Sequence, residues 1–286
     1  MRLVPRPGVP HSRASLAKAS RVAASIVHAG EVSSTNDLAR ALFAPGAPKA
    51  PNAPAPDMDP AVHLVLADVQ TRGRGRLGRT WASVPDSSLT ASFVVGLSPG
   101  FLSSEGAGWV TTAAGLAAIG ALRAVDPSLP LSLKWPNDVL CDGRKLGGIL
   151  CELAGPPTDV AVVVVGVGMN LFVPADRLPT PIATSLQLHA RCLPAFEELR
   201  DELCAGIADG LGSLLGLLLR EGSEPLRERA TRESHTLGRD VEVGLAGGEV
   251  LRGRAVALTP AAALELELPD GTRRVVTAGD VGALPA

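Results

Sequence analysis

The sequence predicts a large domain of mixed helices and strands followed by a small all-β module. Up to about residue 235, apolar runs with strand character alternate with helical segments. After His235 the segments become short and alternating, and they are joined by Gly-Gly (247–248) and Asp-Gly (270–271), both hairpin signals. A chain of 286 residues has room for two such units at ~100–200 residues per domain. We therefore divide the chain into residues 29–234 and a barrel-like module over 235–286.

The composition fits a globular protein with a substantial core. Hydrophobic residues make up 46% of the chain and charged residues 20%. The formal net charge of −2 gives no global electrostatic reason to expect nucleic acid or a membrane as a partner. No apolar run approaches the ~20 residues needed to span a bilayer. The apolar segment 210–222 is short and interrupted by glycine, so we expect a buried helix there.

The cysteines and histidines do not form a recognisable metal site. The five histidines are scattered, and no cysteine stands in a CxxC pair or at metal-ligand spacing from a histidine. We therefore expect no protein-held metal. The cysteines are typical of reduced structural thiols in a cytosolic protein, namely Cys141, Cys151, Cys192 and Cys204.

Two segments are expected to lie outside the regular structure. Residues 1–28 are rich in Arg, Ser and Ala, slightly like a transit peptide. The same Ala/Arg/Pro bias runs through the whole chain, however, so we expect a loosely ordered N-terminus instead. Residues 44–60 are rich in proline and alanine without an amphipathic pattern, which predicts a flexible or polyproline II-like surface insert without chemistry.

Helices and strands follow in a regular order. A first helix is expected over 33–43, because Ser34 or Thr35 can cap it and Asp37 falls in its first turn. Its core-facing side chains are Leu38, Leu42 and Phe43. Strands are expected over 63–69, 88–97, 131–135 and 160–168, a turn and strand over 143–153, an Ala-rich helix over 108–125, and further helices over 195–230.

The stretch TRGRGRLGRTW (71–81) contains a formal GxGxxG match. A dinucleotide-binding turn requires these glycines to follow a strand and to open a helix. The strand over 63–69 meets the first requirement. The residues after Gly78, which include Pro85 and a serine-rich turn, are poor helix material and fail the second. The sequence therefore argues against a dinucleotide site here.

Four arginines give this stretch a different meaning. Arg72, Arg74, Arg76 and Arg79 stand among flexible glycines, and a guanidinium meets carboxylate or phosphate oxygens two at a time. The pattern favours a mobile loop that closes over an anion, and a solvated basic loop is the alternative. Because the net charge of the chain is close to zero, the basic character is local, which favours a site.

Two further motifs end predicted strands. In KWPND (134–138) a cation, an amide and a carboxylate surround one bend, although an ordinary strand exit with a salt-bridged lysine has the same sequence. In GVGMN (166–170) glycines at a strand end permit close approach of a ligand to the backbone, and Asn170 adds a polar group there.

Taken in order, these stretches resemble the biotin protein ligase family. The resemblance covers about residues 30 to 282, and its most specific parts are the arginine–glycine stretch and KWPND. Its motifs are S-T-N (34–36), Q-T-R-G-R-G-R-L-G-R-T-W (70–81), K-W-P-N-D (134–138), R-K-L-G-G-I-L (144–150) and G-V-G-M-N (166–170). The resemblance implies an α+β catalytic domain related to class II aminoacyl-tRNA synthetases and lipoate ligases, followed by an SH3-like C-terminal domain.

The resemblance also implies substrates and partners. Family members use ATP and Mg²⁺ to make biotinyl-5′-AMP and then move the biotinyl group to one lysine of a biotin carboxyl carrier protein of acetyl-CoA carboxylase or a related acyl-CoA carboxylase. We therefore expect biotin and ATP as substrates, with Mg²⁺ arriving on ATP. We also expect a cytoplasmic monomer or weak homodimer without DNA or membrane partners.

Site residues carry over motif by motif. The resemblance implies a biotin pocket made of Ser34, Thr35, Asn36, Gln70, Arg74, Gly75, Arg76, Lys134, Gly147 and Gly148. It implies a nucleotide site made of Arg76, Arg79, Trp81, Asn137, Lys145 and Asn170, with Trp81 on the adenine side. The expected catalytic residues are Lys134, which would bridge the biotin carboxylate and the α-phosphate, Arg76, which would close over both, and Asp138, which would help the acceptor lysine to lose its proton.

The chain departs from the family pattern in two places. Many members carry an arginine near the C-terminus that approaches ATP, whereas this chain ends in AGDVGALPA. Some bacterial members also carry an N-terminal helix-turn-helix, but only about thirty residues precede the S-T-N motif here, so we expect no DNA-binding role.

Two other functions were weighed against this one. Lipoate or octanoyl transferases of the same fold group resemble one another in an R-R-x-x-G-G-G-x-V-x-H pattern, which this chain lacks. A non-catalytic biotin sensor could use the same pocket, but Lys134 and the complete arginine loop favour chemistry.

Overall fold

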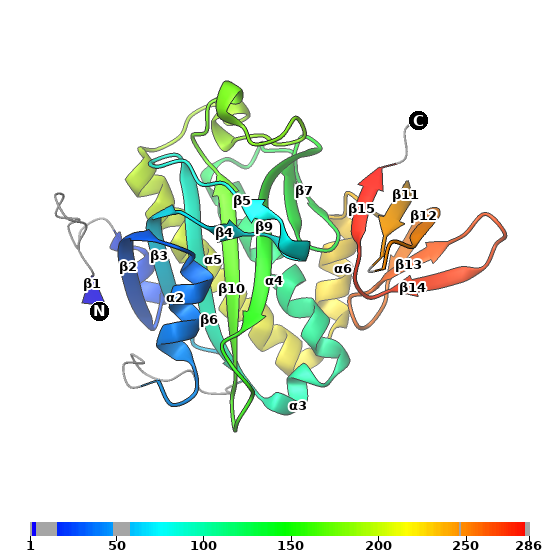
Figure 1. The fold of residues 1–286 in the computed structure, drawn as a ribbon, viewed down its shortest axis with the longest axis horizontal. Coiled ribbons are helices and arrows are strands. Elements are labelled where there is room, and N and C mark those ends of the chain that lie inside the picture. Colours follow the sequence, from blue (N-terminus) through cyan, green and yellow to red (C-terminus); the bar gives the residue numbers. More distant parts are fainter. Residues whose placement is uncertain (1, 4–15, 48–57, 246, 284–286) are drawn as a thin grey trace.

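A computed structural model describes residues 2–3, 16–47, 58–245 and 247–283, and it has the expected two parts (Figure 1). The larger part is built on an eight-stranded sheet with the order β1-β2-β3-β6-β10-β9-β8-β7. Helix α2 (Thr35–Phe43) covers one face of this sheet, while α4 (Trp109–Val125) and α5 (Phe196–Glu221) pack on the other (Figure 1). The α+β class predicted from the sequence is confirmed.

The sheet is mostly antiparallel. Its first three strands are parallel to one another, and antiparallel pairing begins between β3 and β6. The central pair, β10 with β6, is aligned over ten residue pairs. The strands are β1 (Arg2–Leu3), β2 (Ser25–Val32), β3 (His63–Gln70), β6 (Ser88–Leu97), β7 (Leu131–Lys134), β8 (Asp138–Cys141), β9 (Arg144–Leu153) and β10 (Ala161–Asn170).

Most predicted elements are present with small shifts of their ends. The helix expected over 33–43 is α2, and Ser34 takes its N-cap position without a side-chain cap bond. The strand expected over 88–97 is β6, buried at all ten positions. The segment 210–222 lies in α5, which continues to Glu221 without a break at its glycines. No helix opens after the GxGxxG match, because a single turn at Arg76–Gly78 leads into β5 (Thr80–Trp81).

Three expectations need correction. Residues 16–28, assigned to a loosely ordered terminus, contain α1 (Ala19–Val22) and the start of β2, because the Asp201 carboxylate accepts hydrogen bonds from the backbone N–H groups of Lys18 (2.8 Å) and Ala19 (2.9 Å). Strand β8 was not expected at all. Residues 48–57 of the predicted insert lie outside the described residues, so that prediction stands as it was.

The third correction concerns the expectation that no apolar segment is long enough to span a bilayer. By length and composition, segments 105–125 and 196–221 are long and apolar enough to cross a bilayer, contrary to the sequence expectation. Core helices of soluble proteins pass the same test. Here 56% and 50% of the two apolar windows are buried inside the protein, where α4 and α5 pack on each other beneath the sheet.

The C-terminal part is a five-stranded antiparallel sheet with the order β14-β13-β12-β11-β15. The predicted hairpin turns are present: Gly247 and Gly248 adopt positive φ between β11 and β12, and Gly271 does so between β13 and β14. The strands are β11 (Asp240–Gly244), β12 (Val250–Leu258), β13 (Leu264–Glu267), β14 (Arg273–Val276) and β15 (Asp280–Ala283). The predicted boundary at 234/235 falls between α6 (Glu224–Arg232) and β11.

Two tryptophans of the larger part bond to the β module. Trp109 Nε1 donates to the carbonyl of Pro260 (2.6 Å), and Trp135 Nε1 donates to the carbonyl of Ala262 (2.9 Å). The segment between the two parts also pairs with the edge of β7, because His235 N donates to Leu133 O (2.7 Å). These contacts fix the β module beside β7, and its last strand thereby reaches the site described next.

Candidate active site

A cavity of about 600 Å³ lies between the sheet, the arginine loop and strand β15. Its floor comes from β9 and β10, its roof from the loop over residues 73–81, and its far wall from residues 279–282 of the β module. Of the predicted site residues, all except Gly147 line it: Ser34, Thr35, Asn36, Gln70, Arg74, Gly75, Arg76, Arg79, Trp81, Lys134, Asn137, Asp138, Lys145, Gly148 and Asn170.

Gly147 has a different place. A Cβ atom there would come within 2.6 Å of Met169 Cγ and 2.7 Å of the carbonyl oxygen of Gly168. The absence of a side chain therefore lets β9 and β10 lie close together. Gly147 shapes the floor of the cavity from beneath and is not part of its wall.

The S-T-N segment and Gln70 meet at one end of the cavity. Gln70 Oε1 accepts hydrogen bonds from the Thr35 backbone N–H (2.7 Å) and from the Thr35 hydroxyl (3.1 Å). Ser34, Thr35 and Asn36 are all about 3% exposed, because they form the buried first turn of α2 above β6 and β10. With its oxygen already bonded, Gln70 can offer its amide N–H₂ group to a ligand.

Asn36 is tied into the protein more fully than a simple ligand contact requires. Its Nδ2 donates to the carbonyl of Leu150 (3.2 Å) and to Glu152 Oε2 (2.7 Å). Its Oδ1 lies 2.6 Å from the Ser92 hydroxyl. The amide sits directly on β10, since a Cβ at Gly166 would come within 2.4 Å of Asn36 Oδ1. Gly166 is thus required by the packing of Asn36.

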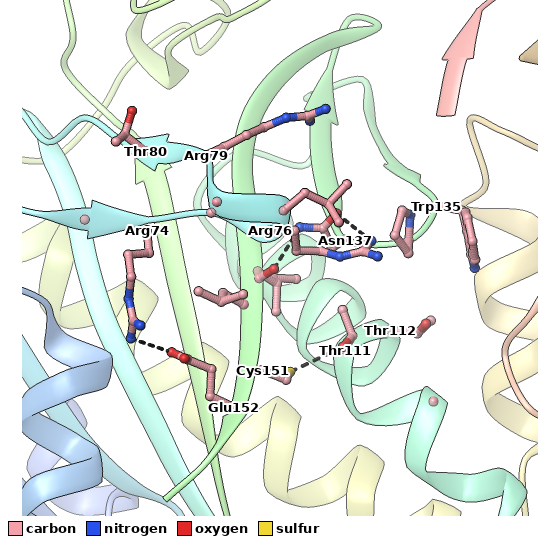
Figure 2. A pocket seen from close by; sticks show the side chains of 18 of the residues that line it. Arg74, Arg76, Arg79, Thr80, Thr111, Thr112, Trp135, Asn137, Cys151 and Glu152 are labelled. Carbon is pink, nitrogen blue, oxygen red and sulfur yellow. Dashed lines mark hydrogen bonds and ion pairs between the residues drawn. The ribbon is translucent and has the colours of Figure 1, made fainter. Parts of the chain in front are cut away.

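The arginine loop is a short hairpin whose arginines point in different directions. Strand β4 (Gly73–Arg74) pairs with β5, and Leu77 at the tip adopts positive φ with 66% of its surface exposed. Arg74 Nη2 donates to Glu152 (2.9 Å; Figure 2) and to Asp37 (2.6 Å), whereas Arg79 forms an ion pair with Asp280 of the β module.

Arg76 lies between these two anchored ends. Its Nη1 is 3.5 Å from Asn137 Oδ1, a weak contact, and its side chain points inward (Figure 2). Burial lowers the pKa of the Arg76 guanidinium, and the charges of Asp280 and Asp138 act in the opposite direction. An arginine nevertheless stays protonated in proteins. Arg76 therefore brings a positive charge into the cavity that no ion pair of the described residues neutralises.

The two lysines of the cavity differ in their partners. Lys145 Nζ lies 2.6 Å from Asp138 Oδ1 and forms an ion pair with it. Lys134, at the end of β7, has no carboxylate within ion-pair distance in the part of the chain that the structure describes. The alternative of a salt-bridged lysine at a strand exit is therefore not what the structure has at Lys134.

Three residues predicted to face a nucleotide, Trp81, Asn137 and Asn170, line the same cavity. The Trp81 ring lies against the floor, because a Cβ at Gly168 would come within 2.4 Å of its Cε2 atom. Asn170 is buried, and its Nδ2 donates to the carbonyl of Thr184 (2.9 Å). Asn137 Nδ2 donates to the carbonyl of Ile149 (2.8 Å), which fixes the side chain beside Arg76.

The structure adds residues that sequence reasoning missed. Asp280 of β15 faces the cavity, and its hydrogen bond from Arg79, together with the charges of Arg79, Lys134 and Lys145, lowers its pKa although burial acts in the opposite direction. Glu152 bonds to both Asn36 and Arg74. No local pattern marks either residue, because their partners lie far away in the sequence.

A second cavity, of about 950 Å³, shares the arginine loop with the first (Figure 2). It is lined by the start of α4, by Trp135 and Pro136, and by residues 261–262 of the β module. Arg76 and Asn137 border both cavities. The arginine loop and Asn137 therefore border two adjoining spaces.

The geometry suits a reaction between two anions. Positive charges from Lys134, Arg76 and Arg79 surround one space, and the S-T-N pocket at its end offers uncharged donors and acceptors. No histidine, cysteine or serine in this cavity is paired with a base as an activated nucleophile would be. The site is built to bring bound reactants together and to stabilise negative charge.

Comparison with known proteins gives consistent results. Residues 59–170 match the Biotin/lipoate A/B protein ligase family, and residues 236–281 match the Biotin protein ligase C terminal domain. The chain is 34% identical to the biotin–[acetyl-CoA-carboxylase] ligase of Mycobacterium tuberculosis over 221 residues (76% of this chain, 77% of the relative). It is 31% identical to the enzyme of the same name from Paracoccus denitrificans (67% and 84%).

Solved structures agree on the fold. The biotin protein ligase of Aquifex aeolicus in complex with biotin and ATP is 23% identical, covers 92% of this chain with 99% of its own, and superposes with a TM-score of 0.69. The biotin protein ligase of Leishmania major in complex with biotinyl-5-AMP is 25% identical and covers 89% and 99%, with a TM-score of 0.54.

Proposed function

The chain belongs to the biotin protein ligase family, and on this premise we propose that it joins biotin to the acceptor lysine of a carrier protein in two steps. In the first, biotin and ATP give biotinyl-5′-AMP and pyrophosphate. In the second, the acceptor lysine takes the biotinyl group and AMP leaves. The observation that carries the proposal is Lys134, a lysine without an ion-pair partner among the described residues, which faces the same cavity as Arg76 and the S-T-N pocket.

The first step requires a carboxylate to approach a triphosphate. Two unit charges of like sign at ~4 Å repel by ~4 kcal/mol at an effective dielectric constant near 20. A cation between them removes this barrier, and a lysine already bound to a carboxylate would supply less of the needed charge. Lys134 therefore bridges the biotin carboxylate and the α-phosphate, and Arg76 reaches the same phosphate from the roof. The carboxylate oxygen bonds to the α-phosphorus as pyrophosphate leaves.

Biotin and the nucleotide take opposite ends of the cavity. Thr35 and Gln70 receive the ring end of biotin, with Ser34 and Asn36 shaping the pocket from within α2. Gly75 and Gly148 let loop and sheet backbone approach the ligand. Trp81 flanks the adenine, and Arg79, Asn137, Lys145 and Asn170 face the rest of the nucleotide.

In the second step the acceptor lysine attacks the acyl carbon. Its ammonium must first lose a proton, and we assign this role to Asp138, which lines the cavity and pairs in register with Lys134. The Asp138 carboxylate forms an ion pair with Lys145 (2.6 Å), and a carboxylate of this kind is the group that would accept the proton. The loop excludes water meanwhile, which protects the mixed anhydride from hydrolysis.

Mg²⁺ enters with the triphosphate. Mg²⁺ binds through one or two carboxylates together with substrate phosphates, and no dedicated protein cage is needed. The described residues contain no group of three or more His, Cys, Asp or Glu side chains arranged to hold an ion. The two carboxylates on the cavity wall, Asp138 and Asp280, are the residues that would face it, and the ion would neutralise phosphate charge.

The acceptor is the biotin carboxyl carrier domain of acetyl-CoA carboxylase or a related acyl-CoA carboxylase. The names of the relatives from Mycobacterium tuberculosis and Paracoccus denitrificans support this assignment. We further propose a cytoplasmic enzyme that acts as a monomer or weak homodimer and has neither DNA nor membrane as a partner. The four cysteines, all free, agree with a reducing compartment.

One experiment tests the proposal. The protein is incubated with biotin, ATP, Mg²⁺ and a purified carrier domain, and the carrier is weighed by mass spectrometry. We expect the mass of one biotinyl group to be added, and none on a carrier whose acceptor lysine is replaced by arginine. Biotin binding without transfer and without pyrophosphate release would instead indicate a non-catalytic sensor and would contradict the proposal.

A further inference from the structure

Glu152 joins the buried end of the site to the arginine loop. It lies on β9, opposite Val164 of β10, with 21% of its side chain exposed. One of its oxygens, Oε2, accepts hydrogen bonds from Asn36 Nδ2 (2.7 Å) and from Arg74 Nη2 (2.9 Å; Figure 2). The same atom therefore holds a residue of the S-T-N pocket and a residue of the loop.

Glu152 and Arg74 belong to a larger network of charged side chains. Arg74 also bonds to Asp37 (2.6 Å), and Arg40 lies 3.7 Å from Glu152 Oε1. Two carboxylates and two guanidinium groups thus form one network on the side of α2 that faces the loop. A hydrogen bond in which one or both partners are charged is stronger than a neutral one. The network therefore holds the base of the loop down on α2 and β9.

Asn36 depends on the same carboxylate. Its amide bonds to Ser92, the carbonyl of Leu150 and Glu152, and it rests directly on Gly166. Asn36 and Arg74 both donate to Glu152 Oε2. If Arg74 moves away, the hydrogen bond between Asn36 Nδ2 and this oxygen therefore changes in strength. The ligand pocket and the loop cannot rearrange independently.

We propose that Glu152 is a positioning residue that couples occupancy of the biotin pocket to closure of the arginine loop, and so retains biotinyl-5′-AMP until the acceptor arrives. The inference rests on the proposed function. Glu152 borders the second cavity but not the one that holds the predicted site residues, so its role there is exerted through Arg74 and Asn36. Its expected effect lies on retention of the intermediate and not on the chemical step.

The test replaces Glu152 by glutamine and uses Glu265→Gln as a matched control. Glu265 has nearly the same exposure (22%) and also accepts a bond from an arginine, Arg273 (3.0 Å), but lies in the β module. Dissociation of preformed biotinyl-5′-AMP should become about tenfold faster in Glu152→Gln, the scale of one lost charge-assisted bond that is partly screened by solvent. The rate of adenylation at saturating biotin and ATP should stay within about twofold of wild type, and Glu265→Gln should change neither.

A double-mutant cycle with Arg74→Gln separates coupling from a general structural effect. If Glu152 acts through Arg74, the double variant should release the intermediate no faster than Arg74→Gln alone. Rates that multiply, or wild-type retention in Glu152→Gln, would overturn the proposal. Should Glu152→Gln fail to fold, Asp37→Asn removes the other carboxylate of the network and should accelerate release by about threefold, within the range for an exposed pair; unchanged release would again overturn the proposal.

Hydrogen exchange of the free protein supplies a readout that does not depend on activity. The amide of Gly75 donates to the carbonyl of Arg79 (2.7 Å), so its exchange rate reports opening of the loop. Exchange at Gly75 should be faster in Glu152→Gln than in wild type or Glu265→Gln, and equal rates would contradict the coupling. A wild-type protein that makes no biotinyl-5′-AMP would defeat the proposed function, while the exchange result would still decide the role of Glu152 in holding the loop.

Discussion

The floor and the roof of the active-site cavity are held by different kinds of interaction. The floor is the centre of the sheet, where β10 pairs with β6 over ten residues and with β9 over seven. The roof is a hairpin of two-residue strands with two aligned pairs. Backbone pairing and close packing hold the floor, whereas side-chain ion pairs hold the roof.

Two ion pairs of the roof, Arg74 with Asp37 and Arg79 with Asp280, are exposed, whereas Glu152, the second partner of Arg74, is only 21% exposed. Arg74 has 39% of its side chain exposed and Arg79 has 59%, and their partners Asp37 and Asp280 are exposed to a similar degree. Exposed pairs contribute ~0–1 kcal/mol each. A phosphate or carboxylate of a ligand can therefore replace these partners at little cost. The difference teaches that the backbone carrying Lys134, the last residue of β7 in the same sheet, is fixed before any ligand binds, while the position of the loop depends in part on the ligand.

Replacement of Lys134 by alanine removes the cation at the end of β7 and should have the largest effect. In the proposed first step its contacts strengthen as charge moves onto the α-phosphate oxygens, so adenylation should slow by ~10²–10³. Biotin binding should weaken less, because Gln70 and Thr35 remain. Lys134→Arg should restore little activity, since a planar guanidinium does not replace a compact ammonium.

The measurement is pyrophosphate release at saturating biotin and ATP. Lys18→Ala serves as the control, since Lys18 pairs with Glu202 away from the cavity. A Lys134→Ala rate within about threefold of wild type would refute the catalytic role, because it lies well inside the expected loss.

The support of the floor can be tested through Asp68, which precedes Gln70 by two residues on β3. Burial alone would raise the pKa of this carboxyl, but His28 and Arg200, whose side chains lie 2.9 Å and 2.8 Å from it, lower it to about 2. The ordinary value is ~3.9, so the group stabilises the fold fully above about pH 4 and loses this contribution as the pH falls towards 2.

Chemical unfolding between pH 7 and pH 2 measures this contribution. Wild type should lose about 2 kcal/mol from Asp68 on acidification, and Asp68→Asn should have lost it already at pH 7. Asp176→Asn, at an exposed position, should behave like wild type. Parallel pH profiles for wild type and Asp68→Asn would show that the carboxylate does not support the sheet.

Asp68 also explains why part of the fold could not be predicted. The elements that were predicted, such as α2, β6 and α4, have local signals: a capping residue, strand composition or an alanine-rich face. Strand β2 was missed. Its His28 is buried against Asp68, and Asp68 in turn bonds to Arg200, 132 residues farther on. A polar residue with partners so distant looks like a surface residue when only the sequence is read.

The residues of the candidate site also fall into those with a local sequence signal and those without one. The residues within motifs, such as Lys134, Gln70 and Trp81, were predicted because each motif is continuous and the resemblance supplied their roles. Glu152 and Asp280 were not, since Glu152 meets Arg74 across 78 residues and Asp280 meets Arg79 across 201. An exposed-looking acid carries no sign of such a partner. Only the folded chain brings the ends of the loop to these carboxylates.

Gly168→Ala tests the contact between Trp81 of the roof and Gly168 of the floor. We expect its effect on activity to be intermediate. A Cβ there would come within 2.4 Å of Trp81 Cε2, so the ring must move away from the floor. Overpacking of this kind costs ~1–3 kcal/mol, and we expect the KM for ATP to rise by about tenfold while the KM for biotin changes little. In Gly120→Ala the new Cβ meets nothing within 4 Å, which makes it the matched control. Equal ATP KM values in the two variants would contradict a role for Trp81 beside the nucleotide.

The smallest expected effect comes from Asp280→Asn, which releases the roof from the β module. We predict that residues 72–86 are cut by trypsin in the free protein and protected by biotin with ATP, because the arginines then gain anionic partners. Loss of the exposed Arg79–Asp280 pair should accelerate cleavage of the free protein by about threefold, in line with the weak energies of such pairs. With both ligands bound the variant and wild type should be cut at equal, slow rates, since the phosphates then hold Arg79 in place of Asp280. Equal cleavage of wild type with and without ligands would mean that the roof is as fixed as the floor.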